Sequence, residues 1–327
     1  MKPILLVQGI EKISEVPRLE ELIDEAEIRC ANSADDLRRL LPGAEVMLGW
    51  NFRAASLRDA WNAADRLRWI HWAGAGVDAA LFDELAHSDV SLTNARGVFD
   101  RPMAEWVLGM IIAFAKRFPQ TMASQARAEW HYRMSELVAG KRALVVGVGS
   151  IGRAVARLLR AAGMNVEGVG RSARDGDPDF GHVSAIDELH ARLAGADYVV
   201  LITPLTEQTR GLFGAAEFAA MNQRARFINI GRGALVDESA LLDALQQGTI
   251  AGAALDVFVE EPLPPESPFW TAPNCLVSPH MSGDYAEFET AMADQFIDNW
   301  RRYRSGEPLL NLVDKSLGFA AAVDPAS

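Results

Sequence analysis

A glycine-rich turn near the middle of the chain carries the strongest chemical signal in the sequence. In ALVVGVGSIGRAVARLLRAAG, an apolar run leads into Gly147, Gly149 and Gly152, and a pattern of small and aliphatic residues follows. The pattern G-x-G-x-x-G between a strand and a helix is typical of dinucleotide binding. Its glycines allow a tight turn, close backbone approach to a pyrophosphate and close helix–strand packing. The helix N-terminus adds N–H groups that attract phosphate. The alternative is a glycine-rich turn that binds nothing.

The strand after this turn ends without the acidic residue that binds the adenosine ribose of NAD in such folds. The stretch VEGVGRSARD carries a glycine there, followed by Arg171, Ser172 and Arg174. Guanidinium groups bind phosphate oxygens, whereas a carboxylate repels the 2′-phosphate of NADP. The sequence therefore predicts NADP(H) as the preferred cofactor, with NAD(H) possible. In the alternative interpretation these arginines are solvated, and Asp175 or Asp177 contacts the ribose.

Three further polar residues follow predicted strands in the second half of the chain. Arg232 lies in FINIGRGALVDESALLDAL, Glu261 in LDVFVEEPLP and His280 in LVSPHMSG. In a doubly wound sheet, the carboxyl ends of the strands meet at one crevice, where ligands bind. We therefore expect these three side chains to lie near the dinucleotide.

Two series of alternating strand and helix patterns position these residues. The first series has strands at residues 4–7, 45–49, 69–71 and 91–93, with helices at 18–27 and 54–63 among the segments between them. After a long helix at residues 102–117, the second series has strands at 143–147, 165–169, 198–203, 226–230, 253–257 and 275–278. A last helix is expected at residues 285–304, and the tail from Phe319 is expected to fray. Such alternation predicts α/β domains with parallel sheets.

Taken together, the glycine motif and the three strand-end residues resemble the D-isomer-specific 2-hydroxyacid dehydrogenase family. The resemblance covers nearly the whole chain, from HWAGAGVD through NARGVFDRPMAEWVLG to the terminal helix. It implies two doubly wound parallel-sheet domains, Rossmann-like or flavodoxin-like. The substrate-binding domain would comprise residues 1–98 and 283–327, with the dinucleotide-binding domain, residues 99–282, inserted into it.

The resemblance also implies an activity and a role for each polar residue. The activity is hydride transfer between NADP(H) and a 2-keto acid/D-2-hydroxy acid pair, in the reducing direction. Arg232 matches the family's substrate arginine, which binds the carboxylate and polarises the ketone. His280 matches the general acid and base. Glu261 matches the carboxylate that partners this histidine, and its charge stabilises the imidazolium.

Substrate contacts are also expected by resemblance. HWAGAGVD is similar to the family loop whose backbone N–H groups hold the substrate carboxylate, which would place Ala75 and Gly76 at the substrate. Trp50 follows an earlier strand and would line the pocket, or else fill a seam between domains. In HMSGDYAEF, Ser282 and Tyr285 depart from the family pattern, so the pocket is expected to differ there.

The remaining cofactor contacts lie along the same crevice. Thr203 and Pro204, in LITPLTEQT, are expected to bound it, and Asp256 matches a family position near the nicotinamide, or else caps a strand end. Ser150 stands where many family members have arginine, and Arg153 would either replace that contact or point into solvent. Further predicted cofactor contacts are Ile151 and Ile230.

Composition narrows the other possibilities. The net charge of −12 disfavours nucleic acid and anionic membrane as partners. No apolar run approaches the roughly 20 residues of a membrane span, so we expect a cytoplasmic protein. Its two cysteines and its histidines show no spacing typical of a metal site or a disulfide framework.

Two other functions fit the same motifs. The fold could oxidise another small anion, such as phosphite or formate, or serve as a dinucleotide-sensing, corepressor-like interaction protein. The absence of a long charge run argues against the latter. The long helix and the segment up to Met134 resemble the family's dimer-forming region, so a homodimer is expected. The long helix also has an apolar face, and burial of that face against the rest of the same chain would explain it without a dimer.

Overall fold

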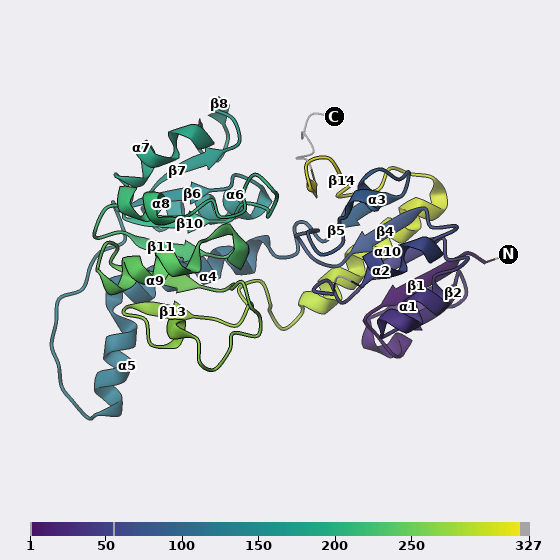
Figure 1. The fold of residues 1–327 in the computed structure, drawn as a ribbon, viewed down its shortest axis with the longest axis horizontal. Helices are drawn as coiled ribbons and strands as arrows, with labels where there is room; N and C mark the ends of the chain where they lie inside the picture. Colours follow the sequence, from purple (N-terminus) through teal and green to yellow (C-terminus); the bar gives the residue numbers. More distant parts are fainter. Residues whose placement is uncertain (1, 55, 321–327) are drawn as a thin grey trace. The chain divides into compact units, whose positions relative to one another are not determined.

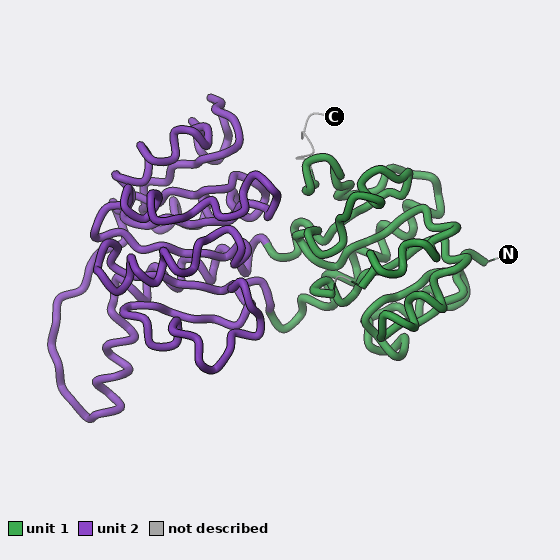
Figure 2. Tube along the Cα trace, in the orientation of Figure 1, with its two compact units in different colours: residues 1–99, 285–327 green, residues 100–284 purple. Residues whose placement is uncertain are grey.

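The computed structural model describes residues 2–54 and 56–320, which form two compact units (Figures 1 and 2). The discontinuous unit comprises Met1–Phe99 and Tyr285–Ser327, and the inserted unit comprises Asp100–Asp284. The chain therefore passes between the units twice. These passages follow residues 99 and 284, where the sequence analysis placed boundaries after 98 and 282.

The discontinuous unit is built on a five-stranded sheet in the order β2-β1-β3-β4-β5, with every neighbouring pair parallel. Its strands are β1 (Ile4–Gln8), β2 (Glu27–Ala31), β3 (Val46–Gly49), β4 (Trp69–Trp72) and β5 (Ser91–Asn94). Its helices are α1 (Ala34–Leu40), α2 (Leu57–Ala60), α3 (Asp83–Ala86) and α10 (Phe288–Ser305).

Both faces of this sheet carry large buried side chains, as a parallel sheet requires. Ile70 and Trp72 point into one apolar cluster, together with residues of α1, α2 and α3. Trp69 points to the other face, where its ring stacks on Phe296 of α10 at 5.6 Å. The last helix thus completes a unit that begins at the N-terminus.

The helix predicted at residues 18–27 is wrong. Only Leu19–Leu22 forms a short 3-10 helix, and β2 begins at Glu27. Arg18, at the N-terminal end of that turn, has a φ of +61°, which a right-handed helix cannot include. The helix predicted at 54–63 is shorter, because α2 begins at Leu57 and the chain continues as a 3-10 helix at Trp61–Ala63. Of the predicted frayed tail, Phe319–Ala320 pairs as β15 with β14 (Val313–Asp314), and the rest lies outside the described residues.

The inserted unit has an eight-stranded sheet in the order β13-β12-β11-β10-β6-β7-β9-β8. Its strands are β6 (Arg142–Val146), β7 (Asn165–Gly170), β8 (Arg174–Asp177), β9 (Gly181–Ala185), β10 (Tyr198–Leu201), β11 (Arg226–Asn229), β12 (Gly252–Leu255) and β13 (Cys275–Val277). All neighbours pair in parallel except β8 and β9, which form an antiparallel edge. The expected α/β class with doubly wound parallel sheets is confirmed.

The six strands predicted for this unit are present, but two more were missed. β8 reads RDGD and β9 reads GHVSA, so neither has an apolar run or a strict alternation. A strand at a sheet edge can be polar because only part of its surface is buried. These two strands matter here, because they carry the polar residues beside the predicted cofactor site.

Helices cover both faces of the larger sheet, and each face has its own apolar cluster. The helices are α4 (Asp100–Lys116), α5 (Phe118–Ala126), α6 (Ser150–Ala161), α7 (Leu189–Leu193), α8 (Ala215–Ala220) and α9 (Glu238–Gln246). The buried side of α4 includes Ala104, Val107 and Ile111, which belong to one cluster with Val155 and Leu159 of α6. Packing within the chain therefore accounts for this face of the long helix.

An extended segment at residues 127–139 follows α5 and leads to β6 (Figure 1). Among its polar residues it carries large apolar side chains that are exposed within this single chain, with exposed fractions of 100% for Trp130, 80% for Tyr132 and 77% for Met134. Glu136 anchors the segment, since it accepts a hydrogen bond of 2.6 Å from Arg226. We call residues 118–139 the arm.

Candidate active site

The glycine turn after β6 has the geometry of a phosphate cradle. Gly147 has a φ of +113°, and a Cβ there would lie 2.5 Å from the carbonyl oxygen of Ile202. A Cβ on Gly152 would lie 2.0 Å from the carbonyl oxygen of Gly147, so α6 packs against the turn only because residue 152 is glycine. A Cβ on Gly149 would meet no described atom within 4 Å. Packing does not require glycine at 149, which leaves that backbone open to a ligand.

This turn lies at the point where the strand order reverses. β6 and β10 are neighbours, β7 lies beyond one and β11 beyond the other, and such a switch point is where ligands bind in doubly wound sheets. Thr203 and Pro204 follow β10, and Ile230 follows β11. The Thr203 hydroxyl oxygen is buried and has no hydrogen-bond partner among the described residues. A dinucleotide in the crevice would give this group a partner.

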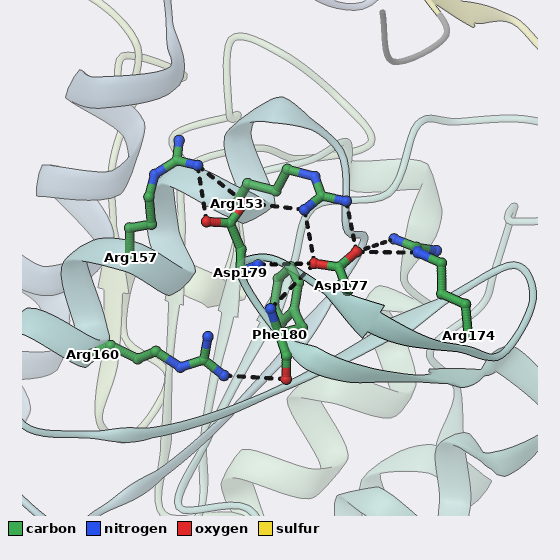
Figure 3. Close-up of polar contacts among 7 residues, drawn as sticks. All are labelled: Arg153, Arg157, Arg160, Arg174, Asp177, Asp179 and Phe180. Atoms are coloured by element: carbon green, nitrogen blue, oxygen red, sulfur yellow. Dashed lines mark hydrogen bonds and ion pairs between the residues drawn. The ribbon is translucent and has the colours of Figure 1, made fainter. Parts of the chain in front are cut away.

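Ser150 and Ile151 begin α6, directly after the cradle, and both are partly buried. The Ser150 side chain is too short to replace the guanidinium of an arginine at this place. The structure also corrects the expectation for Arg153, which neither lies open toward the pyrophosphate nor points into solvent. Its guanidinium pairs with Asp177 at 2.7 Å and with Asp179 at 3.0 Å (Figure 3).

The polar residues after β7 fall into two groups. Arg171 and Ser172 are exposed. Arg174 begins β8 and donates to Asp177 Oδ2 from Nε at 3.1 Å and from Nη2 at 2.8 Å. Asp177 is itself 1% exposed, so the alternative in which Asp177 binds the ribose is wrong. Asp175 lies on the surface and pairs with a neighbouring histidine of β9.

His280 and Glu261 form a direct pair. His280 Nδ1 lies 2.7 Å from Glu261 Oε2, and the two side chains are 27% and 32% exposed. The other carboxylate oxygen accepts the backbone N–H of Phe258 at 2.9 Å, which fixes the carboxylate. His280 has a φ of +53°, an unfavourable region for a residue with a side chain, and such strain concentrates at functional sites.

The electrostatics of this pair favour an ionised Glu261. Partial burial alone would raise the pKa of this carboxyl. The hydrogen bonds from His280 and Phe258, together with the charge of Arg232, outweigh that effect and lower the pKa below its usual value. The carboxylate is therefore charged at neutral pH, so it accepts the hydrogen bond from His280 Nδ1 and orients the imidazole.

Arg232 lies in a tight turn after β11. Its Nη1 donates to the carbonyl oxygen of Gly231 at 2.9 Å. The Asn229 side chain holds the turn from inside, accepting the N–H of Gly231 at 3.0 Å and donating to the carbonyl oxygen of Arg232 at 3.0 Å. A Cβ on Gly233 would lie 1.9 Å from the carbonyl carbon of Phe258, so the turn packs directly against the loop that leads to Glu261.

Asp256 organises the loop that carries His280. It is 1% exposed, and its carboxylate accepts the hydroxyl of Ser278 at 2.6 Å and the backbone N–H groups of Met281 and Ser282, both at 2.9 Å. The backbone N–H of His280 donates to the carbonyl oxygen of Asp256 at 2.8 Å. The capping interpretation of Asp256 therefore accounts for its burial, and a contact with the nicotinamide stays a prediction.

The expected substrate contacts Trp50, Ala75 and Gly76 belong to the discontinuous unit. Trp50 follows β3, and the other two follow β4, so they share the carboxyl edge of that sheet. The Ala75 carbonyl oxygen accepts a hydrogen bond of 2.6 Å from Asn94, which fixes that loop. The inserted unit brings together Arg232, Glu261 and His280.

The sequence analysis missed several residues that hold the site. Asn229 supports the turn of Arg232, Ser278 donates to Asp256, and Glu238 accepts the N–H of Val259 at 2.8 Å. Only Asn229 had a recognisable signal, since a short polar side chain at the end of a buried strand often binds the following turn. The others act across the fold, from segments 21 or more residues away.

The site defines a class of protein before any comparison. A dinucleotide cradle at a switch point, an arginine turn and a carboxylate–histidine pair fit a nucleotide-dependent oxidoreductase. The model of the D-isomer-specific 2-hydroxyacid dehydrogenase NAD-binding domain matches residues 108–282. The chain belongs to the D-isomer-specific 2-hydroxyacid dehydrogenase family, as the sequence analysis expected. It is an oxidoreductase that moves a hydride between a nicotinamide dinucleotide and a 2-keto acid/D-2-hydroxy acid pair.

Several known proteins are similar to it. A glyoxylate/hydroxypyruvate reductase A from Serratia proteamaculans is 30% identical over 313 residues, which cover 92% of this chain and 94% of the relative. A D-3-phosphoglycerate dehydrogenase from Methanocaldococcus jannaschii is 31% identical over 300 residues, which cover 91% of this chain and only 57% of that longer protein. Among solved structures, an NADPH-dependent glyoxylate/hydroxypyruvate reductase from Sinorhizobium meliloti, in complex with NADP and sulfate, has a TM-score of 0.82 and 29% identity. That match covers 98% of this chain and 100% of the other.

No group of three or more His, Cys, Asp or Glu side chains is arranged to hold a metal ion within the described ranges. Within those ranges, too, no helix has the length and apolarity needed to span a membrane.

Proposed function

We propose that this protein is an NADPH-preferring reductase of small 2-keto acids of the glyoxylate and hydroxypyruvate class. The observation that carries the cofactor preference is the end of β7, where Gly170 replaces the ribose-binding acid and Arg171, Ser172 and Arg174 follow. A 2′-phosphate here would meet guanidinium groups and a hydroxyl, and residue 170 itself offers no carboxylate to repel it. The Sinorhizobium meliloti relative, which is NADPH-dependent, supports the same preference.

The residues around the cradle would hold the rest of the dinucleotide. The pyrophosphate would lie on the backbone of the glycine turn, at the N-terminus of α6, where N–H groups attract anions. Thr203, with its buried hydroxyl, and Pro204 would line the crevice on the side of β10. The full proposed set is Gly147, Gly149, Ser150, Ile151, Gly152, Arg171, Ser172, Arg174, Thr203, Pro204, Ile230 and Asp256.

In the proposed reaction, each polar residue handles a charge that the substrate carries or develops. The Arg232 fork would bind the substrate carboxylate and polarise the ketone oxygen, which makes the carbonyl carbon electrophilic. Bound NADPH supplies the hydride that adds to this carbon. The ketone oxygen becomes an alkoxide as the C=O double bond is reduced, and His280 would donate a proton to it. The balanced products are the D-2-hydroxy acid and NADP⁺.

Glu261 would keep His280 ready for that step. With Nδ1 bound to the carboxylate at 2.7 Å, the imidazole presents Nε2 as its proton donor. The backbone N–H of Phe258 fixes the carboxylate, so the imidazole is oriented before the substrate binds. From the discontinuous unit, the backbone of Ala75 and Gly76 would add N–H groups to the substrate carboxylate, and Trp50 would line the pocket.

A steady-state screen tests this proposal. Glyoxylate, hydroxypyruvate, pyruvate and a larger 2-keto acid are each reduced with NADPH and with NADH, and the reaction is followed by the nicotinamide absorbance. We expect a higher kcat/KM with NADPH, and turnover of glyoxylate, of hydroxypyruvate or of both. A higher kcat/KM with NADH would refute the cofactor preference. Oxidation of formate or phosphite without any keto-acid reduction would refute the substrate class.

We also propose that the protein is a cytoplasmic homodimer. The arm exposes large apolar side chains, including Phe118, Met122, Trp130 and Tyr132, which a second copy would cover. The free thiols of Cys30 and Cys275 fit a reducing compartment. Light scattering of the purified protein, with Trp130→Glu as the disrupting variant, tests the dimer. A monomeric wild-type protein would refute it. Cell fractionation tests the compartment.

A further inference from the structure

Asp177 is a buried carboxylate with an unusual number of partners. It accepts hydrogen bonds from Arg153, from Arg174 and from the backbone N–H groups of Asp179 and Phe180 (Figure 3). Its side chain is 1% exposed, although it lies in the edge strand β8. These partners join α6, which starts at the phosphate cradle, to the edge of the sheet beside the end of β7.

We infer that Asp177 is a positioning residue for cofactor specificity, which holds the Arg174 guanidinium at the carboxyl end of β7 to receive the 2′-phosphate. This inference rests on the proposed NADPH preference, and it adds a residue that contacts no part of the cofactor. Asp177 would act only through Arg174.

The geometry of Arg174 carries the inference. Asp177 takes the Nε–Nη2 edge of the guanidinium, at 3.1 and 2.8 Å. Nη1 points elsewhere, and it would lie 3.7 Å from a Cβ at Gly170. Residue 170 ends β7, where an NAD-specific member of this fold class would place its ribose acid. The hydrogen atoms on Nη1 therefore lie at the place where a 2′-phosphate would replace that acid, and no described residue accepts them.

A guanidinium that is already fixed in position loses less conformational entropy on binding phosphate than one that moves freely in solvent. A long arginine side chain that moves freely in solution must lose that freedom when it binds phosphate. The pair with Asp177 imposes this ordering before the cofactor arrives. The side chain of Arg174 is still 40% exposed, so a ligand can reach it.

The negative charge of Asp177 opposes phosphate binding, whereas its hold on Arg174 favours it. Whether Asp177→Asn raises or lowers the KM for NADPH therefore shows which of the two effects is larger. A carboxylate near the 2′-phosphate weakens binding by repulsion. Here that repulsion is offset, because Arg153 forms a two-bond pair with the same carboxylate, at 2.7 and 2.8 Å. Removing the carboxylate would leave Arg153 and Arg174 repelling each other. We therefore expect the loss of orientation to exceed the gain from reduced repulsion.

The test compares Asp177→Asn with Asp179→Asn in the full-length protein. Asp179 lies in the same cluster, but its ion pairs among the described residues are with Arg153 and Arg157 and not with Arg174. Asp177→Asn should raise the KM for NADPH and the inhibition constant of 2′-AMP by roughly three- to tenfold. The KM for NADH, the inhibition constant of 5′-AMP and kcat should stay within about twofold of wild type. Asp179→Asn should change none of these by more than about twofold.

A second pair of variants tests whether Asp177 acts through Arg174. In an Arg174→Gln background, Asp177→Asn should produce no further rise in the KM for NADPH, because the side chain it positions is gone. Arg174→Lys keeps the charge but loses the fork, and it should raise the KM for NADPH as much as Asp177→Asn does. This variant leaves Asp177 and Arg153 in place, so it keeps the test meaningful if Asp177→Asn unfolds.

Several outcomes would overturn the inference. They are a lower KM for NADPH in Asp177→Asn, an equal effect of Asp179→Asn, an additive effect in the double variant, or normal NADPH binding by Arg174→Lys. The wild-type protein separates this inference from the proposed function. If wild type prefers NADPH and Asp177→Asn keeps that preference unchanged, only the positioning role fails. If wild type has no preference for NADPH, both fail.

Discussion

Replacing Glu261 by Gln should slow the reaction by about 30-fold without weakening cofactor binding. In the wild-type protein both carboxylate oxygens of Glu261 accept hydrogen bonds, one from His280 Nδ1 at 2.7 Å and the other from the backbone N–H of Phe258 at 2.9 Å. An amide has a single carbonyl oxygen, so glutamine can satisfy one of these donors but not both in the same geometry. Glutamine also removes the negative charge that lies beside the imidazole. A lost charge-assisted hydrogen bond costs about 1.5–3 kcal/mol.

The partial exposure of the pair places the expected loss in the lower half of that range. Both side chains are near 30% exposed, so solvent screens part of their interaction. A loss of about 2 kcal/mol in the transition state corresponds to roughly a 30-fold lower kcat. Binding of NADPH should be unaffected, since neither group contacts the cradle.

Steady-state reduction of glyoxylate or hydroxypyruvate with NADPH measures this effect. Glu260→Gln is the matched control, because it makes the same change at the adjacent, exposed residue. The reasoning is refuted if Glu261→Gln keeps kcat within about twofold of wild type. It is also refuted if Glu260→Gln causes the same loss, because the effect would then come from general charge.

Three further predictions concern the phosphate cradle and the stability of the fold. Gly147→Ala should lower the free energy of unfolding by about 2 kcal/mol or more, because a Cβ would lie 2.5 Å from the Ile202 carbonyl oxygen at a φ of +113°. Gly149→Ala should leave thermal unfolding unchanged but raise the KM for NADPH about tenfold, by blocking the backbone approach to the pyrophosphate; equal destabilisation by both would contradict these roles. The pKa of Glu136 is lowered to about 2, chiefly by its hydrogen bond from Arg226. The unfolded value is about 4.3, so the pair stabilises the fold above that pH and loses its effect as the pH falls toward 2. Glu136→Gln should therefore cost about 1 kcal/mol at neutral pH, roughly half as much near pH 3 and almost nothing at pH 2 and below, in chemical unfolding measurements. A cost that does not change with pH would count against the ion pair.

The sequence predicted the cradle and the strand ends well, because their residue types follow directly from the backbone. At Gly147 and Gly152 any side chain would collide with main-chain atoms, so the turn requires these glycines and the motif predicts the turn. Glu261 and His280 follow β12 and β13, neighbouring parallel strands whose carboxyl ends lie at one edge, so their closeness followed from the predicted topology.

Two of the edge strands, β2 and β8, were missed from the sequence, because neither contains a run of large apolar residues. β2 reads EIRCA and β8 reads RDGD, and pairing with a neighbouring strand stabilises each of them in the extended conformation. The segment at residues 18–27 has helical spacing of its apolar residues, yet Leu19 and Leu22 are buried from a single short turn. Local periodicity could not distinguish that turn from a full helix.

Arg153 illustrates a different limit. Its distance from the cradle suggested a pyrophosphate contact, but its partners Asp177 and Asp179 lie 24 and 26 residues further along the chain. Only the folded sheet edge brings these carboxylates to α6. The same contacts show that Asp177, which the alternative interpretation offered as a ribose ligand, is a buried carboxylate that holds two arginines.

The most direct test of the account is the turnover of His280→Gln with NADPH and a 2-keto acid. The account predicts that kcat falls by a factor of about 100 or more, because the proton donor is lost, while the dissociation constant for NADPH stays within about twofold. A variant that reduces the keto acid at a rate near that of wild type would contradict the assignment of this histidine, and with it the proposed chemistry of the site.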